Sequence, residues 1–272
     1  MNFALNHIVS PRRSHAELFD LAVALGVDQV EIRNDLAGVA IADGTAPETV
    51  RADAAARGLT ILSINALQRF NHWTPARADE ARALAAYASA CGAKALVLCP
   101  VNDTQWQRAL DARLAHLREA LAALLPILKH AGLTGLVEPL GFAECSLRLK
   151  AEAVAAIDAI GGAGTFRLVH DTFHHAVAGE TQIFPAHTGL VHISGVDDPA
   201  VPVSSMRDPH RVLVGRGDRI GNVAQMQALL AGGYAGYFSF EPFSEKIHAL
   251  PDIGAAVRAS MALIQHELHA TA

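Results

Sequence analysis

The chain contains 272 residues, is 51% hydrophobic and carries a formal net charge of −5 with histidine neutral. This acidic balance opposes binding to nucleic acid, which depends on Lys and Arg side chains that neutralise phosphates. The three cysteines form no CxxC pair, and no apolar run reaches the length of a membrane helix, so we expect a cytoplasmic protein with reduced thiols and with neither a nucleic-acid nor a membrane partner.

Short apolar segments, several of them rich in Val and Ile, alternate along the chain with longer segments of helical periodicity. The short segments are typical of strands buried on both faces. In chain order they are residues 3–8, 29–33, 60–65, 95–99, 135–138, 167–171, 190–193 and 237–241. The helical segments are residues 16–25, 47–57, 76–90, 108–130, 151–160, 223–231 and 253–269. Residues 172–189 give only a weak helix signal.

The ends of the predicted helices support this division. Leucines from Leu110 to Leu128 step by three and four residues, which predicts one apolar stripe on the fourth helix, although Pro126 should kink that helix or restart it. Glycines that suit left-handed helix caps follow five helices: Gly26, Gly58, Gly92, Gly132 and Gly233. Eight strand–helix units, with no GxGxxG after the first strand, favour a closed barrel over a dinucleotide-binding sheet. We therefore predict an α/β fold in which residues 1–272 form a single (β/α)₈ TIM barrel domain.

The last four predicted strands each end with a side chain that can bind a metal. These side chains are Glu138, Asp171, His192 and Glu241. Side chains alternate along a strand, and neighbouring strands lie about 4.8 Å apart, so four adjacent strand ends can converge on one point. Three buried carboxylates repel one another unless a cation neutralises them. The predicted cofactor is one divalent ion, either Mn²⁺, Mg²⁺, Co²⁺ or Zn²⁺, because no thiolate enters to select a softer metal.

Each of these residues also has an ordinary structural interpretation. A single acidic residue at a strand end is commonly a helix cap, and a single buried histidine is more often hydrogen-bonded in the core than bound to a metal. Four such residues in succession at the functional face of this fold favour the metal site.

Three further residues are candidates for contact with a substrate. His174 follows Asp171 by three residues and is placed to donate to a hydroxyl or move a proton, although a loop histidine is equally compatible with the spacing. Asn65 ends the third strand, where an inward amide can bind a hydroxyl or cap a turn. Arg211 precedes a GRG segment, residues 215–217, and is placed to anchor a substrate oxygen. The GRG segment alone is a weak phosphate signal, for which ordinary turns are the default explanation.

The order and spacing of several short motifs resemble the xylose-isomerase-like barrel superfamily and, within it, the inosose (2-keto-myo-inositol) isomerases. The motifs are VEIR, VEPLGF, HDTFHH, VHISGVDD, DPHRVLVGRGD and SFEPF. The resemblance implies that Glu138, Asp171, His192 and Glu241 bind a catalytic metal. It also implies that His174 and Arg211 contact oxygens of a keto-polyol substrate.

The chain departs from the AP-endonuclease members of that superfamily, which build a three-metal cluster with additional histidines. Asn65 and Cys99 end the third and fourth strands instead, so a trinuclear phosphodiesterase site is not expected.

The hypothesis that follows is a metal-dependent isomerase in which the cation polarises a ketone. Glu138 and Glu241 would then carry the proton between adjacent carbons through an enediolate. Four alternatives stay open: a ketose 3-epimerase, a hydroxypyruvate isomerase, a dehydratase or other lyase on the same scaffold, and a non-catalytic sugar-binding barrel. Assembly into a homo-oligomer is also possible.

Overall fold

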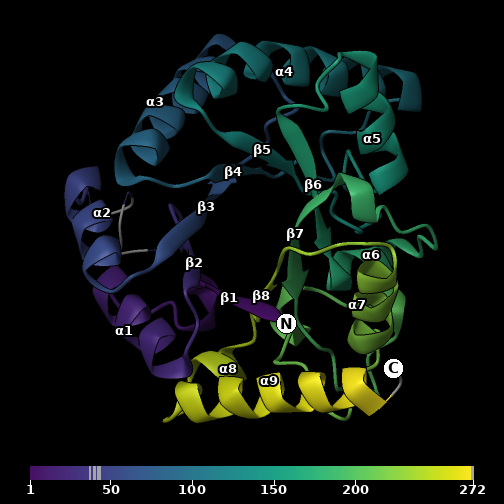
Figure 1. The fold of residues 1–272 in the computed structure, drawn as a ribbon. Helices are drawn as coiled ribbons and strands as arrows, with labels where there is room; N and C mark the ends of the chain where they lie inside the picture. The colour runs from purple at the N-terminus through teal and green to yellow at the C-terminus, as the bar shows by residue number, and fades with distance from the viewer. Residues whose placement is uncertain (37, 39–40, 42–43, 271–272) are drawn as a thin grey trace.

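Eight parallel strands close into a barrel in the order β1 to β8 (Figure 1), within a computed structural model that describes residues 1–36, 38, 41 and 44–270. The strands are β1 (Asn2–Asn6), β2 (Gln29–Arg33), β3 (Thr60–Leu67), β4 (Ala95–Leu98), β5 (Thr134–Val137), β6 (Phe166–Asp171), β7 (Thr188–Ile193) and β8 (Tyr237–Phe240). Strand β8 pairs back with β1, with Asn2 opposite Tyr237 and Leu5 opposite Phe240. The predicted (β/α)₈ barrel is therefore confirmed.

Helices surround the barrel on its outside, as Figure 1 shows along the barrel axis. They are α1 (His15–Leu25), α2 (Pro47–Ala56), α3 (Pro75–Cys91), α4 (Leu110–Ala131), α5 (Lys150–Ala159), α6 (Thr172–Ala178), α7 (Asn222–Ala231), α8 (Glu245–His248) and α9 (Ile253–Ala270). The weak signal after residue 171 corresponds to the short helix α6. Helix α4 continues through Pro126, so the expected restart is wrong there. The five glycines predicted as caps all have positive φ.

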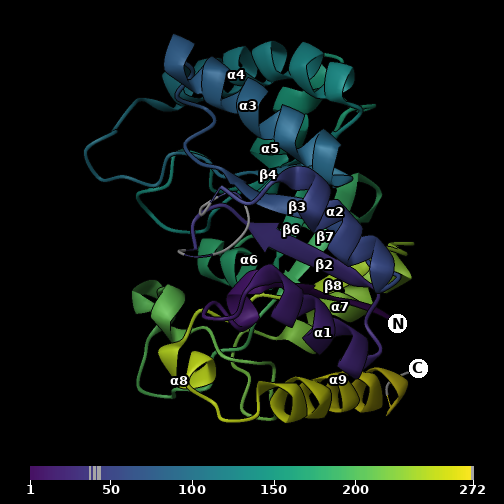
Figure 2. The same ribbon diagram turned by 90° about the vertical axis from the view of Figure 1, so that its left-hand side faces the viewer.

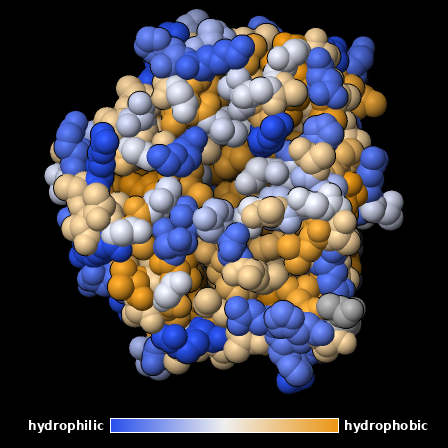
Figure 3. Space-filling view, viewed as in Figure 1, coloured by the Kyte–Doolittle hydropathy of each residue, from blue (hydrophilic) through white to orange (hydrophobic). Residues whose placement is uncertain are grey.

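The two ends of the barrel differ in character. In Figure 2 the arrow of β2 points to the left, towards α6, α8 and the long connections, whereas both termini lie on the right. Figure 3 is viewed from the face at which the strands begin, and it shows hydrophilic residues around the rim and apolar residues nearer the centre. No helix in the described part of the chain is both long enough and apolar enough to cross a membrane.

The space enclosed by the strands is apolar on one side and polar on the other. Residues of β3 to β7, together with Cys99 directly after β4, form a buried apolar cluster there: Ala66, Ala95, Val97, Cys99, Leu136, Val169 and Leu190. Polar side chains from β1, β2, β3 and β8 are buried opposite them: Asn6, Glu31, Ser63, Asn65 and Ser239. Buried polar groups must be hydrogen-bonded to be tolerated, so this polar half of the interior has to be an organised network.

Candidate metal centre

Four metal-capable side chains converge at the C-terminal rim of the barrel. Asp171 ends β6 and His192 lies in β7, while Glu138 and Glu241 directly follow β5 and β8. The backbone N–H of Glu138 donates to Leu98 and that of Glu241 to Ile193, so both glutamates continue their strand ladders. All four are buried, and one ligand atom from each lies within 4.8 Å of the others. The structure thus brings together the four residues that the strand-end pattern singles out.

The charges in this cluster are already paired with cationic side chains. His192 Nδ1 lies 2.9 Å from Glu138 Oε1 and 3.2 Å from Glu241 Oε2. Arg211 Nη2 lies 2.6 Å from Asp171 Oδ2 and 2.9 Å from Glu241 Oε2. Two cationic groups therefore compensate three carboxylates in the region where a divalent ion would do so.

Protonation follows from these contacts. Burial lowers the pKa of His192, but the charges of Glu241, Glu31 and Glu138 outweigh it and raise that pKa well above its ordinary value. Burial alone would raise the pKa of the Glu241 carboxyl group, but the positive charges of His192 and Arg211 outweigh it and lower that pKa. An ion that bound His192 Nδ1 would have to displace a proton, because imidazole ligates metals only in its neutral form.

The donor set fits a divalent cation. Three carboxylates and one imidazole suit ions such as Mn²⁺, Co²⁺ and Zn²⁺, and the four donors are close enough to share one of them. The cluster is therefore compatible with one divalent metal.

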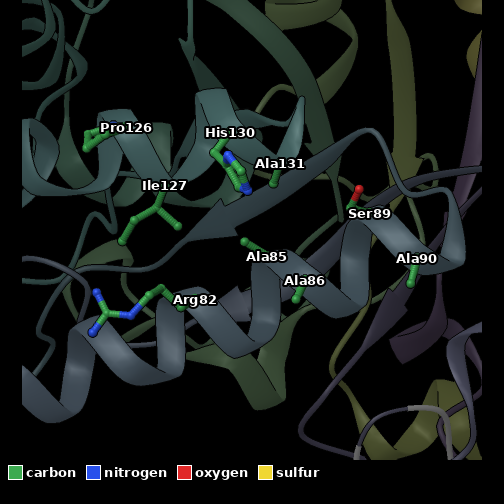
Figure 4. Close-up of a pocket in the computed structure, with 9 residues that line it drawn as sticks. All are labelled: Arg82, Ala85, Ala86, Ser89, Ala90, Pro126, Ile127, His130 and Ala131. Atoms are coloured by element: carbon green, nitrogen blue, oxygen red, sulfur yellow. The ribbon is translucent and has the colours of Figure 1, made fainter.

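A cavity of about 360 Å³ opens above the cluster and would receive a ligand. Its lining includes Glu138 and Glu241 from the cluster and all three of the predicted substrate residues: Asn65, His174 and Arg211. A larger groove of about 650 Å³ lies between α3 and α4 on the outer wall, as Figure 4 shows. The residues that line this groove include no carboxylate and are mostly alanine and other apolar side chains, so the chemistry belongs to the barrel mouth.

His174 is held by α6 with one ring nitrogen committed. Its Nδ1 accepts a hydrogen bond of 3.3 Å from the backbone N–H of Gly141, and the backbone N–H of His174 donates to Asp171 Oδ1 at 3.0 Å. In a neutral ring the proton must therefore sit on Nε2. A side chain that lines the cavity in this tautomer is a hydrogen-bond donor to a ligand oxygen.

We expect Gly141→Ala to damage this arrangement. An added Cβ would lie 2.2 Å from the carbonyl oxygen of His174, a backbone atom that cannot turn away. Overpacking of this kind typically costs about 1–3 kcal/mol of unfolding free energy. Chemical denaturation would measure this loss. Gly164→Ala is the matched control, since its Cβ would meet no atom within 4 Å; equal effects of the two variants would contradict the assignment.

Arg211 lies at the site, whereas the GRG segment that follows it does not. The Arg211 guanidinium is buried against Asp171, Glu241 and the hydroxyl of Ser194. Gly215 and Gly217 lie in a separate loop, where Asp218 Oδ2 accepts from the backbone N–H of Asn222 at the start of α7. A carboxylate at that helix terminus opposes an anion, so the weak phosphate signal gains no support.

Sequence reasoning missed two charged residues of β2. Glu31 is fully buried beside His192, and Arg33 donates to both oxygens of Asp35 at 2.8 Å and to Glu241 Oε1 at 3.1 Å. The amide nitrogen of Asn65 is committed to Glu31 at 2.8 Å and to Ser63 at 2.9 Å. The signal was present, because the strand-end argument applied to VEIR places Glu31 and Arg33 on the same inward face.

A second buried ion pair supports α6 from outside the cavity. Lys150 Nζ, at the first residue of α5, lies 2.6 Å from Glu180 Oε2 and 2.8 Å from His175 Nδ1 in α6. The Glu180 carboxylate also accepts from the backbone N–H groups of Lys150 and Ala151. This pair therefore joins the start of α5 to α6, the helix that carries His174.

We expect Glu180→Gln to lower the free energy of unfolding by about 3 kcal/mol at pH 7, because it leaves Lys150 buried without a counter-charge. Burial raises the pKa of Glu180, but hydrogen bonds from His175 and Lys150 lower it from 4.5 to about 2. A carboxyl group whose pKa is lowered in the folded protein stabilises the fold at any pH above its pKa in the unfolded chain. The difference in unfolding free energy between wild type and variant should therefore shrink as pH falls from 4.5 towards 2.

Urea unfolding at several pH values would test this, with Glu245→Gln as the control. Glu245 pairs with Arg12 on the surface, where both side chains are more than 70% exposed. Its loss should cost less than about 1 kcal/mol. A pH-independent difference for Glu180→Gln would contradict the interpretation.

The fold and the site together define a class: a closed (β/α)₈ barrel with a buried carboxylate–histidine cluster at the C-terminal rim. The chain belongs to the Xylose isomerase-like TIM barrel family, whose model matches residues 19–266. Among curated proteins no match was found.

One solved structure gives the same assignment, and others share the fold. A xylose isomerase domain containing protein from Salmonella typhimurium LT2 is 32% identical, with 98% of this chain and 97% of that one covered and a TM-score of 0.88. The IolI protein, described with a bound zinc atom, is 20% identical over 97% of this chain and 98% of that one, with a TM-score of 0.86. D-psicose 3-epimerase from Clostridium cellulolyticum H10, described with D-tagatose, is 15% identical over 98% and 99%, with a TM-score of 0.75. The last two likenesses show the fold alone.

Proposed function

We propose that this protein is a metal-dependent isomerase that moves or inverts a carbonyl/hydroxyl centre in a keto-polyol of the inosose type. One observation carries the proposal: four buried donors converge on one point, and two of them, Glu138 and Glu241, also line a cavity of about 360 Å³. A metal site that opens into a small polar cavity supports chemistry on a bound ligand better than a purely structural role.

The charges around the cavity favour a neutral substrate. Three arginines line it, and each has a carboxylate partner: Arg33 with Asp35, Arg69 with Asp103 and Arg211 with Asp171. Among the described lining residues, then, each arginine charge is already matched. A phosphorylated substrate would have to break one of these pairs, whereas hydroxyl groups can hydrogen-bond to them intact.

Each residue has a role that follows from its position. A divalent cation would act as a Lewis acid on a ketone oxygen. Glu138 and Glu241 would accept and return the proton at adjacent carbons, since a positioned carboxylate is an effective general base. His174 would donate from Nε2 to a substrate oxygen, and Arg211 would hold Asp171 and Glu241 in place while facing the ligand.

Two of the similar structures support the proposal of a metal-dependent isomerase. The IolI protein is described with a bound zinc atom, and the D-psicose 3-epimerase is described with D-tagatose. A ketose 3-epimerase is the second candidate, because inversion at the carbon beside a ketone needs the same cation and the same pair of proton carriers. The two candidates differ only in where the proton returns.

Metal analysis of the purified protein, combined with turnover assays in D₂O, would test the proposal. The panel should contain keto-inositols, free ketoses including D-psicose and D-tagatose, and hydroxypyruvate. We expect one equivalent of a divalent metal and solvent deuterium in the product of one keto-polyol. Loss of water from the product would instead assign a lyase, and binding without turnover would assign a non-catalytic barrel.

A further inference from the structure

Glu31 lies at the centre of the polar half of the barrel interior, on the far side of His192 from the candidate metal centre. Its side chain is fully buried, and its two oxygens lie 3.2 and 3.3 Å from His192 Nε2. The other ring nitrogen, Nδ1, is the one near Glu138 and Glu241. The imidazole therefore stands between a single carboxylate and the cluster of donors.

Four further side chains point hydrogen-bond donors at Glu31. Oε2 accepts from Ser63 Oγ at 2.5 Å and from Asn65 Nδ2 at 2.8 Å. Oε1 accepts from Ser239 Oγ and from Asn6 Nδ2, the latter at 3.4 Å. Only an ionised carboxylate accepts at both oxygens without donating in return. These four donors thus favour the carboxylate form of Glu31, in which both oxygens accept hydrogen bonds.

An acceptor at this position determines the form of the imidazole. With Glu31 accepting, His192 Nε2 must carry a hydrogen, and in the neutral ring Nδ1 then keeps its lone pair free for a ligand bond. Histidine ligands of metals commonly donate their second N–H to such a partner, which fixes both the tautomer and the ring orientation. Asn6 extends the network to the centre itself, because its Nδ2 also donates to Glu241 Oε1 at 3.2 Å.

We propose that Glu31 is a positioning residue of the metal centre, which holds His192 in the tautomer and orientation that present Nδ1 to the cation. The inference rests on the metal site of the proposed function but not on its turnover. Glu31 itself touches neither the cation nor the substrate in this assignment, so its effect should be transmitted through His192.

Binding of Co²⁺ to the purified, metal-free protein would test this directly by competition with a chromogenic chelator. We expect Glu31→Gln to weaken Co²⁺ binding by about 10–100-fold, the usual cost of losing such a partner. Glu245→Gln is the control, since it removes an exposed carboxylate that pairs with Arg12 on the surface and should leave Co²⁺ affinity unchanged.

A double-mutant cycle separates this role from general damage to the barrel. If Glu31 acts through His192, then Glu31→Gln should add little to the loss already caused by His192→Ala. An equal loss in both backgrounds, or no loss in either, would overturn the proposal.

The Co²⁺ form also offers a spectroscopic readout. In wild type, the paramagnetically shifted N–H proton of His192 should be visible by NMR and protected from exchange, and Glu31→Gln, which keeps an oxygen but loses the charge, should reduce that protection. Glu31→Asp should restore it in part. Ser239→Ala removes one of the hydrogen bonds to Glu31 and should cause a smaller loss of protection. It replaces Glu31→Gln in this test if the glutamine variant does not fold. Rapid exchange in wild type would contradict the assignment.

The outcomes also distinguish this inference from the proposed function. Failure of wild type to bind Co²⁺ would overturn the metal centre and the role of Glu31 with it. Tight binding with the expected behaviour of Glu31→Gln, but no turnover of any keto-polyol, would overturn the catalytic proposal alone.

Discussion

For the isomerase proposed above, removal of a divalent cation is expected to lower turnover of the keto-polyol by about 10³-fold, and addition of Mn²⁺, Co²⁺ or Zn²⁺ should restore it. Lewis-acid stabilisation of a developing oxyanion is worth several kcal/mol, and each 1.4 kcal/mol corresponds to about tenfold in rate. Arg211 and His192 compensate the three carboxylates electrostatically. Neither group, however, can accept the lone pair of a ketone oxygen as a metal ion does.

Dialysis against a chelator, followed by metal analysis and assay, would measure this effect. Metal addition should also raise the melting temperature, because a ligand that binds only the folded state stabilises it by about 2.7 kcal/mol at a hundred times its Kd. Asp171→Asn is the matched variant, since it removes one negative charge from the cluster while keeping the size of the side chain and one oxygen. Full activity in protein shown to be free of metal would contradict the prediction.

The strand-end residues were predictable because their signal is local. Glu138, Asp171, His192 and Glu241 each stand at the end of an apolar run, and the alternation of side chains assigns their direction. No distance between them had to be known, since a parallel barrel brings all its strand ends to one rim. The fold and the cluster of four donor side chains could thus be derived from segments of a few residues each.

The polar network beneath the cluster is not local in this sense. The contact between Glu31 and His192 joins residues 161 positions apart, and that between Asn6 and Glu241 joins residues 235 apart. The second of these exists only because β8 pairs with β1. The strand pattern points Glu31 inward, but neither partner reveals the other in the sequence, so the closed barrel has to be known before Glu31 can be paired with His192.

Some local signals were too weak for a different reason. Helix α6 has only 7 residues, less than the two turns that a helical period needs to become visible. Its start is determined by Asp171, whose side chain accepts from His174 and caps the helix. The same carboxylate is a candidate metal donor, so the helix-cap and metal interpretations of this residue are both compatible with the structure.

Replacement of the two glutamates by glutamine is expected to separate proton transfer from metal binding. Each variant should slow exchange of the substrate α-proton with solvent by about 10²–10⁴-fold, the usual contribution of a positioned acid or base. Glutamine keeps an oxygen for the cation, so metal content should fall less than activity. Deuterium incorporation in D₂O, followed by NMR, would measure exchange independently of net turnover.

The two variants should differ in their effects on stability. Glu241 contacts Arg33 at one oxygen and Arg211 at the other, so Glu241→Gln leaves two buried guanidinium groups short of a partner. Glu138 contacts His192 Nδ1 and the thiol of Cys99 instead. A lower melting temperature is therefore expected mainly for Glu241→Gln, and the loss of exchange in Glu138→Gln is the clearer measure of chemistry.

Cys99→Ser provides the control for Glu138, because a hydroxyl can replace the thiol as donor to Glu138 Oε2. It should leave exchange within a few-fold of wild type, whereas Glu138→Gln should not. Near wild-type exchange in both glutamine variants would show that neither carboxylate carries the proton. The cluster would then bind and polarise the ligand only, and the base would have to be sought among the other carboxylates that line the cavity, such as Asp35.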